Sequence, residues 1–192
     1  MRRIGFNETI CFFAGVNGAG KSTLYQTFPK DHQMPRINTD EILKTFGDWK
    51  ITGDVMKAGK RAVQKLNQCL SMGSSFNQET TLCGKTIFRT IEKARNQGYY
   101  IELYYVGVDS VELAKQRIAY RVSKGGHGIP DKDVEKRYLE TFQNLKIVLP
   151  MCNLASLYDN TREFRRIAIY KDGLPVRVSH NVPDWFQRVQ SD

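Results

Sequence analysis

Eight residues near the N-terminus match the spacing G-x-x-x-x-G-K-[ST] and read GVNGAGKS from Gly15 to Ser22. The apolar run TICFFAG leads into them, and the helix-forming run TLYQTF follows them. This order predicts a strand, a glycine-rich loop and a helix in direct succession, which is the context of a phosphate-binding loop. Glycines let the backbone wrap closely so that its N–H groups point inward, and the helix N-terminus adds positive potential.

The lysine and the hydroxyl that end the loop indicate a nucleoside triphosphate as ligand. Lys21 is expected to reach the terminal phosphates and Ser22 to hold Mg²⁺. A glycine-rich turn that only packs a helix against a strand would give no reason for this pair. The predicted nucleotide-binding residues are Gly15, Val16, Asn17, Gly18, Ala19, Gly20, Lys21, Ser22 and Thr23.

Apolar runs alternate with amphipathic segments along the rest of the chain, which predicts an α/β fold with a parallel sheet. Helical spacing covers Val55 to Leu70, with Gly73 placed to end that helix, and Ile87 to Ala94, with the stop at Gly98. Asp109 and Glu112 resemble a capping pair before a helix whose apolar stripe is Val111, Ala114, Ile118 and Val122. The expected strands are TICFFAG, PRINTD, SSFNQETTL, YYIELYYVGVD and SLYDNT, followed by a hairpin that turns at Asp172-Gly173.

The composition is that of a soluble chain of 192 residues, so a single domain over 1–192 is expected. No stretch approaches the roughly 20 apolar residues of a membrane span, and a cytoplasmic protein without a membrane partner is expected. The four cysteines stand singly, which indicates neither a disulfide frame nor a zinc site. The formal charge of +9 favours an anionic partner and does not separate phosphorylated small molecules from nucleic acid.

The basic charge is concentrated between residues 115 and 146, where eight Lys and Arg face four Asp and Glu. Within it, RVSKGGHGIPDKDVEKRY places three glycines around His127, between two helix-like segments. Phosphoryl transfer needs balanced charge and excluded water, so we interpret 115–137 as a helical lid that closes over the phosphates. Arg121 and Arg137 are the predicted phosphate clamps, with Arg117 and Lys124 next.

Two residues of the predicted lid have alternative interpretations. Arg137 could instead form a surface salt bridge with Glu140 or Asp133. His127 is either a phosphate donor or a solvent-exposed loop residue, since no rigid metal geometry is expected among glycines.

Two carboxylates follow expected strands, where ligands lie in open α/β sheets. Asp40, after the second strand, is the candidate base that orients and deprotonates a hydroxyl acceptor, and its alternative role is the N-cap of EILKTF. Glu79 comes after the third strand together with Thr80 and Thr81. These three side chains form a hydrogen-bonding set suited to a sugar or another polyol.

The ordered series AGVNGAGKST, INTDEI, FNQETT, R-x-x-x-GGHGIP with EKRY, and LYDN resembles the zeta-toxin family of small kinases in a compact form. The resemblance runs from about Thr9 to Thr161. It implies a P-loop kinase-like fold, ATP with Mg²⁺, and, as in the toxins, transfer to the sugar 3′-hydroxyl of UDP-N-acetylglucosamine. It also implies phosphate and metal roles for Lys21 and Ser22, and LYDN beside the adenine.

The same resemblance implies that Asp40 is the base, that Glu79 and its threonines bind the sugar, and that Arg121 is the first lid arginine. A second lid arginine of the toxins falls where this chain has Gly125 to Pro130, so either Arg137 or His127 takes its place. No antitoxin partner is identified.

The predicted function is therefore an ATP-dependent kinase of a small hydroxyl acceptor, for which a nucleotide sugar is one candidate. Other interpretations are a metabolite kinase of the shikimate or gluconate type, a polynucleotide kinase, and a P-loop ATPase that acts as a switch. The motifs LSGGQ and N/T-K-x-D, which mark transporter ATPases and guanine-binding switches, are missing from the sequence.

Overall fold

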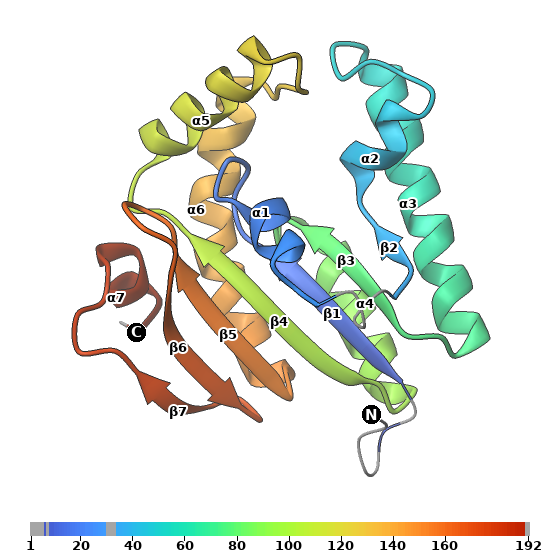
Figure 1. The fold of residues 1–192 in the computed structure, drawn as a ribbon. Helices are drawn as coiled ribbons and strands as arrows, with labels where there is room; N and C mark the ends of the chain where they lie inside the picture. Colours follow the sequence, from blue (N-terminus) through green and yellow to red (C-terminus); the bar gives the residue numbers. More distant parts are fainter. Residues whose placement is uncertain (1–5, 7, 30–33, 191–192) are drawn as a thin grey trace.

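The computed structural model describes Phe6 and residues 8–29 and 34–190, and these fold around one seven-stranded sheet (Figure 1). The strand order is β2-β3-β1-β4-β5-β6-β7. The first five strands are parallel, whereas β6 and β7 form an antiparallel hairpin on β5. The strands are β1 (Thr9–Ala14), β2 (Arg36–Ile37), β3 (Phe76–Thr80), β4 (Tyr100–Gly107), β5 (Leu154–Asp159), β6 (Arg165–Lys171) and β7 (Leu174–Val178).

The central strand β1 is almost fully buried because it pairs with β3 on one side and with β4 on the other. Its sequence, TICFFA, is a continuous apolar run, as expected for a parallel strand covered on both faces. The chain leaves β1 toward the β2 edge and later returns to β4 on the opposite side. The loop after β1 therefore lies where the strand order reverses, which is where open α/β sheets bind ligands.

Helices cover both faces of the sheet and rise beyond the carboxyl ends of its strands. Figure 1 shows α1 on one face, α4 and α6 on the other, and α5 facing α2 and α3 across the loop after β1. The helices are α1 (Lys21–Gln26), α2 (Thr39–Lys44), α3 (Thr52–Met72), α4 (Thr86–Asn96), α5 (Val111–Ser123), α6 (Asp131–Val148) and α7 (Asp184–Gln190), with the short 3₁₀ helix η2 (Leu149–Met151) after α6.

The C-terminal helix α7 completes the core, and sequence analysis did not anticipate it. Trp185 is fully buried, and its ring stacks on Phe142 of α6 with centroids 5.7 Å apart. The backbone of Gly107 passes so close that a Cβ there would stand 2.3 Å from the Trp185 ring. A glycine is thus required at the end of β4 for the tryptophan to fit.

The structure confirms the predicted α/β class, a mostly parallel sheet flanked by helices. It also confirms the helix end at Gly73 and the hairpin turn, where Asp172 and Gly173 have φ values of 49° and 79°. Two details of α5 were wrong. Ser110, not Asp109, caps this helix by accepting from the Leu113 N–H, and Val122 is exposed rather than part of the buried stripe.

The predicted single domain spans 1–192, of which 1–5, 7, 30–33 and 191–192 lie outside the described residues. Among the residues that are described, no helix is both long and apolar enough to cross a membrane.

Candidate active site

The loop between β1 and α1 takes its shape from glycines in backbone conformations that other residues rarely adopt. Gly15 has φ 134°, and a Cβ there would lie 2.1 Å from the Val106 carbonyl oxygen of β4. Gly20 has φ 106° and stands at the start of α1. These two positions fold the backbone tightly from strand to helix, as a phosphate-binding loop requires.

Lys21 is buried within this loop, with 7 % of its side chain exposed. Its Nζ donates to the Val16 carbonyl oxygen at 3.2 Å and lies 3.9 Å from Glu79 Oε1. Burial lowers the pKa of Lys21 below its ordinary value, while the carboxylates of Glu79 and Asp40 oppose that shift. The ammonium is thus a desolvated cation held in place by the loop itself.

One cavity, which we call the P-loop cavity, opens over the end of this loop and has a volume of about 350 Å³. Arg117 and Arg121 of α5 reach it from the predicted lid, and Asn160 borders it from the end of β5. The P-loop cavity is also lined by Gly18, Gly20, Lys21, Ser22, Thr23 and Glu79. It therefore brings together the predicted phosphate-binding loop and two of the predicted lid arginines.

Both arginines keep guanidinium groups with unused hydrogen-bonding capacity. Arg117 Nη2 donates to the Thr161 carbonyl oxygen at 3.4 Å, and Arg121 Nε donates to the His127 carbonyl oxygen at 2.9 Å. Arg117 Nη1 and Arg121 Nη2 are buried and have no hydrogen-bond partner among the described residues. Burial lowers the pKa of both side chains, which nevertheless stay charged at neutral pH. An anion in this cavity would meet the positive charge of both guanidinium groups.

A second cavity, which we call the Asp40 cavity, has a volume of about 500 Å³ and is also lined by Lys21. Asp40, His127 and Arg137 meet there, and Trp49, Thr80 and Thr81 also line it. Lys21 and Glu79 line both cavities, so the two spaces adjoin at the P-loop lysine. An acceptor in the Asp40 cavity would face phosphates in the P-loop cavity across Lys21.

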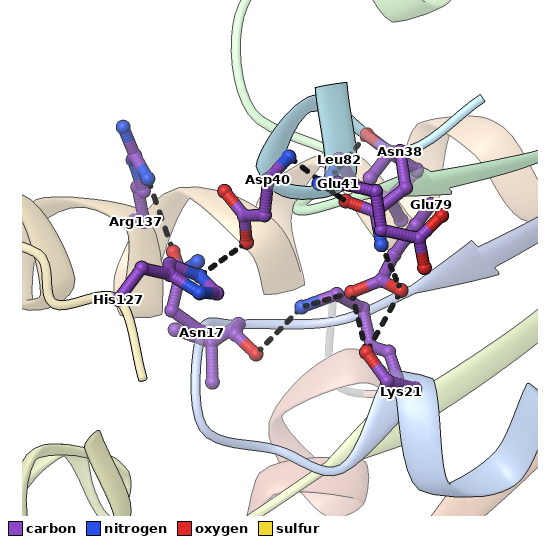
Figure 2. A network of polar contacts seen from close by, with 12 residues as sticks. Asn17, Lys21, Asn38, Asp40, Glu41, Glu79, Leu82, His127 and Arg137 are labelled. Atoms are coloured by element: carbon purple, nitrogen blue, oxygen red, sulfur yellow. Dashed lines mark hydrogen bonds and ion pairs between the residues drawn. The ribbon is translucent and has the colours of Figure 1, made fainter. Parts of the chain in front are cut away.

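Asp40 lies in the first turn of α2 but does not cap it. Asn38 caps the helix, because its side chain accepts from the N–H groups of Asp40 and Glu41. The alternative role of Asp40 as N-cap was therefore wrong. Its carboxylate instead lies 2.5 Å from His127 Nε2. Figure 2 shows the two side chains pointing toward each other.

The pKa of Asp40 is held below its ordinary value. Burial alone would raise it, but the hydrogen bond and charge of His127, together with the charges of Lys21 and Arg121, outweigh that effect. Asp40 is consequently ionised at neutral pH. An ionised carboxylate accepts hydrogen bonds only, which is what orienting an acceptor hydroxyl requires.

Glu79 at the end of β3 is the most connected side chain of the site (Figure 2). Its carboxylate accepts from Ser22 Oγ at 3.0 and 3.2 Å, from Arg36 at 2.7 Å and from Asn38 at 2.9 Å. Glu79 thus faces the P-loop, in addition to lining the Asp40 cavity where its predicted sugar contact would occur. Arg36 and Asn38 hold it there and were not singled out from the sequence.

The side chains of Ser22 and Glu79 are suitable for holding Mg²⁺ at the P-loop. Both line the P-loop cavity and offer oxygen atoms, the ligands that Mg²⁺ prefers. No cluster of three or more His, Cys, Asp or Glu side chains that could hold a metal occurs in the described part of the chain. A metal bound here would take few protein ligands and complete its shell with phosphates and water, the usual arrangement for Mg²⁺.

Of the remaining predicted lid residues, Arg137 and His127 line the Asp40 cavity and Lys124 lines neither cavity. Arg137 of α6 donates from Nη1 to Asn17 Oδ1 at 3.1 Å and lines the Asp40 cavity rather than the P-loop cavity. Lys124 lies outside both cavities, with its Nζ over the Tyr120 ring. His127 has only 13 % of its side chain exposed, so it is not the solvent-exposed loop residue that was considered.

The fold and the paired cavities define a P-loop kinase-like protein. Residues 10–145 match the AAA domain family. A Haemophilus influenzae (strain ATCC 51907 / DSM 11121 / KW20 / Rd) protein, named only as an uncharacterized protein, is 33 % identical over 127 residues, which cover 66 % of this chain and 90 % of the relative. The chain belongs to the AAA domain family.

Solved structures show the same fold at low sequence identity. The AvrRxo1-ORF1:-ORF2 complex with ATP matches with a TM-score of 0.73 at 14 % identity, over 97 % of this chain and 64 % of the other. This chain thus spans less than two thirds of that protein. The PezAT chromosomal toxin-antitoxin system of Streptococcus pneumoniae matches with a TM-score of 0.62 at 18 % identity, over 87 % of this chain and 74 % of the other.

A third match is the Pnkp1/Rnl/Hen1 RNA repair complex, with a TM-score of 0.57 at 18 % identity. It covers 76 % of this chain and 47 % of that one. The resemblance to zeta toxins noted from the motifs is therefore matched by structural similarity of fold.

Proposed function

We propose that this protein is an ATP-dependent kinase that transfers the γ-phosphoryl group to a hydroxyl of a small acceptor. The observation that carries the proposal is that two cavities share Lys21, one lined by two arginines and the other by an ionised carboxylate. The first matches the needs of a triphosphate and the second those of a hydroxyl. A nucleotidase or switch would have no use for the second.

In this proposal the P-loop backbone, Lys21 and the two α5 arginines bind the triphosphate and balance the charge that spreads over the migrating group. Asp40 accepts a hydrogen bond from the acceptor hydroxyl and orients its oxygen toward the γ-phosphorus. As the new P–O bond forms and the bond to the β–γ bridging oxygen breaks, the hydroxyl proton passes to Asp40. ADP and a phosphate ester are the products, and Asp40 later releases the proton to water.

Ser22, with Glu79 beside it, would hold Mg²⁺ at the edge of the P-loop cavity. When bound, Mg²⁺ supplies positive charge to the phosphate oxygens. Glu79 then has two tasks in the proposal, because it fixes Ser22 and also presents a carboxylate to the acceptor side.

We further propose that the acceptor is a nucleotide sugar of the UDP-N-acetylglucosamine type. Thr80 and Thr81 place hydroxyl groups in the wall of the Asp40 cavity, and Trp49 adds an aromatic ring there. Its volume of about 500 Å³ lies in the range of cavities that hold ligands of this size. Transfer would be to a sugar hydroxyl next to Asp40.

The proposal is tested by incubating the pure protein with γ-labelled ATP and Mg²⁺ together with one acceptor at a time. The panel is UDP-N-acetylglucosamine, gluconate, shikimate and an oligonucleotide with a 5′-hydroxyl, and a reaction without acceptor measures hydrolysis. Label on UDP-N-acetylglucosamine supports the full proposal. Label on another member of the panel would support the kinase proposal with a different acceptor. Release of labelled phosphate at the same rate with and without every acceptor would make the protein an ATPase.

A further inference from the structure

We infer that His127 is the positioning residue of Asp40 and that it couples closure of the predicted lid to the assembly of the catalytic carboxylate. The inference rests on the proposed kinase function, in which Asp40 orients the acceptor. Its basis is a contact between segments 87 residues apart in the sequence, from Asp40 in α2 to His127 in the loop between α5 and α6.

The contact has a defined direction. Nε2 of His127 lies 2.5 Å from Asp40 Oδ2. An ionised carboxylate can only accept, so a proton shared across this short contact comes from Nε2 of the histidine. This leaves the other carboxylate oxygen, Oδ1, to accept from the acceptor hydroxyl.

The backbone on both sides of His127 is fixed by close contacts. On one side, Arg121 Nε donates to the His127 carbonyl oxygen, and a Cβ at Gly126 would stand 2.5 Å from the Arg121 side chain. On the other side, a Cβ at Gly128 would stand 2.7 Å from the Trp49 ring. These glycines therefore allow close packing, so that the loop delivers one imidazole to one carboxylate.

This arrangement assigns His127 a role that differs from both sequence interpretations, a phosphate donor and a solvent-exposed loop residue. His127 lines the Asp40 cavity and is not among the residues that line the P-loop cavity. Both ring nitrogens are buried and make no hydrogen bond of regular geometry within the described residues, and Nε2 is in ion-pair contact with Asp40. One ring nitrogen thus contacts the base, and the other is enclosed by the surrounding residues.

In the reaction His127 keeps its Nε2 proton throughout, while the acceptor proton moves to Asp40 as the P–O bond forms. Removing the imidazole leaves Asp40 ionisable but free to rotate away from the hydroxyl. A misplacement of about 1 Å can cost roughly 10²-fold in rate. His127→Ala should therefore lower kcat for phosphoryl transfer by about that factor and leave the KM for ATP unchanged.

Two further substitutions separate positioning from mere packing. His127→Gln places an amide N–H at about the reach of Nε2, whereas His127→Asn places one at about the reach of Nδ1. Because the contact uses Nε2, Gln should restore most of the lost kcat and Asn should not. Equal losses in all three variants would overturn the inference and leave His127 as a packing residue.

Coupling to the lid has a readout that needs no acceptor. Trp49 packs on Gly128 of the loop, and Trp185 is fully buried in the core, so quenching by acrylamide reports mainly on Trp49. Acrylamide is neutral, so the charge changes of the variants do not alter its concentration near the protein. His127→Ala and Asp40→Ala should each increase quenching of Trp49, and the double variant should show no more than either single change.

The outcomes distinguish the two proposals, with ATP, Mg²⁺ and the same panel of four acceptors as the probes. If the wild type transfers phosphate and His127→Ala does so equally fast, the inference is overturned and the kinase proposal stands. If the wild type phosphorylates no probe, the kinase proposal fails, and the quenching series still decides the contact. Additive effects there overturn the inference, and non-additive effects support it.

Discussion

Arg137 Nη1 donates a hydrogen bond to Asn17 Oδ1 at 3.1 Å, which joins α6 to the P-loop across 120 residues of sequence. Arg137 therefore reaches across the Asp40 cavity instead of pairing on the surface with Glu140 or Asp133. Glu140 has another partner, since it accepts from the Gly84 N–H at 2.7 Å. The predicted lid thus meets the P-loop from its outgoing helix as well as from α5.

Arg137→Ala should lower the kcat for phosphoryl transfer and raise the KM for the acceptor more than that for ATP. The reason is that Arg137 lines the Asp40 cavity and steadies the P-loop through Asn17. Steady-state kinetics with both substrates varied measures kcat and the KM for each substrate. Lys136→Ala, which removes the same charge from the exposed neighbouring position, is the control and should behave like the wild type.

Arg121→Ala should reduce turnover by about 10³-fold while ATP binding falls much less, because charge balance matters most in the transition state. The variant also loses the bond to the His127 carbonyl, so quenching of Trp49 should increase. Lys124→Ala serves as the matched control, since Lys124 lies outside both cavities. A variant with normal turnover and weakened nucleotide binding would make Arg121 a binding residue only.

Lys21→Ala and Ser22→Ala should fold normally and lose most ATP-dependent activity. Both side chains belong to the P-loop and neither fills the space between apolar side chains of the core, so the circular dichroism spectrum should resemble that of the wild type. ATP–Mg²⁺ binding by calorimetry should weaken severely. Lys60→Ala on the exposed side of α3 removes the same charge and should change neither property. Wild-type transfer by Lys21→Ala would remove the phosphate-loop role.

Local patterns in the sequence were sufficient for the α/β fold class and for most of its strands and helices. The phosphate-loop spacing, the alternation of apolar runs and amphipathic segments, and the turn at Asp172-Gly173 each depend on neighbours in the chain, and the structure bears them out. Helix α7 was not predicted because it is short and contains few apolar residues. The position of Trp185 also depends on Gly107, which is distant in the sequence.

The candidate site was predictable as a set of residue types but not as a set of pairs. Asp40 was singled out, yet its partner His127 lies far along the chain in a glycine-rich loop with no periodicity. Asn38 could have been recognised as the cap of α2, because Asn is a preferred N-cap and two acidic residues follow it. The ion pair between Arg36 and Glu79 and the hydrogen bond from Arg137 to Asn17 depend on strand order, which one sequence does not specify.

The stability contributed by Asp40 should depend on pH in a defined window. The pKa of this carboxyl is lowered from its ordinary value of 3.8 in the folded protein, so its ionised form favours folding above that value. The contribution is lost as pH falls through the lower, folded-state pKa. Urea denaturation should therefore find wild type more stable than Asp40→Asn at pH 7, with the difference shrinking below pH 3.8.

Substitution of Asp40 by Asn tests the catalytic role most directly. Asparagine keeps the shape and the hydrogen-bonding ability of the side chain but loses the charge that takes the proton, so transfer should fall by about 10²-fold or more. ATP binding should persist, since Asp40 is not among the residues that line the P-loop cavity. Expression of the wild type in bacteria should slow growth if the acceptor is UDP-N-acetylglucosamine, and Asp40→Asn should be tolerated at equal protein level.

Asn38→Ala is the structural counterpart of that experiment. Asn38 caps α2 and holds Glu79, so its removal should destabilise the protein by about 1 kcal/mol or more, measured by urea denaturation. Asp40→Asn should leave the cap intact, because the Asn38 side chain accepts from the backbone N–H of residue 40 whatever side chain stands there. Normal transfer by Asp40→Asn would count against Asp40 as the base. Unfolding of that variant would show that Asp40 has a structural role and would leave the base unidentified.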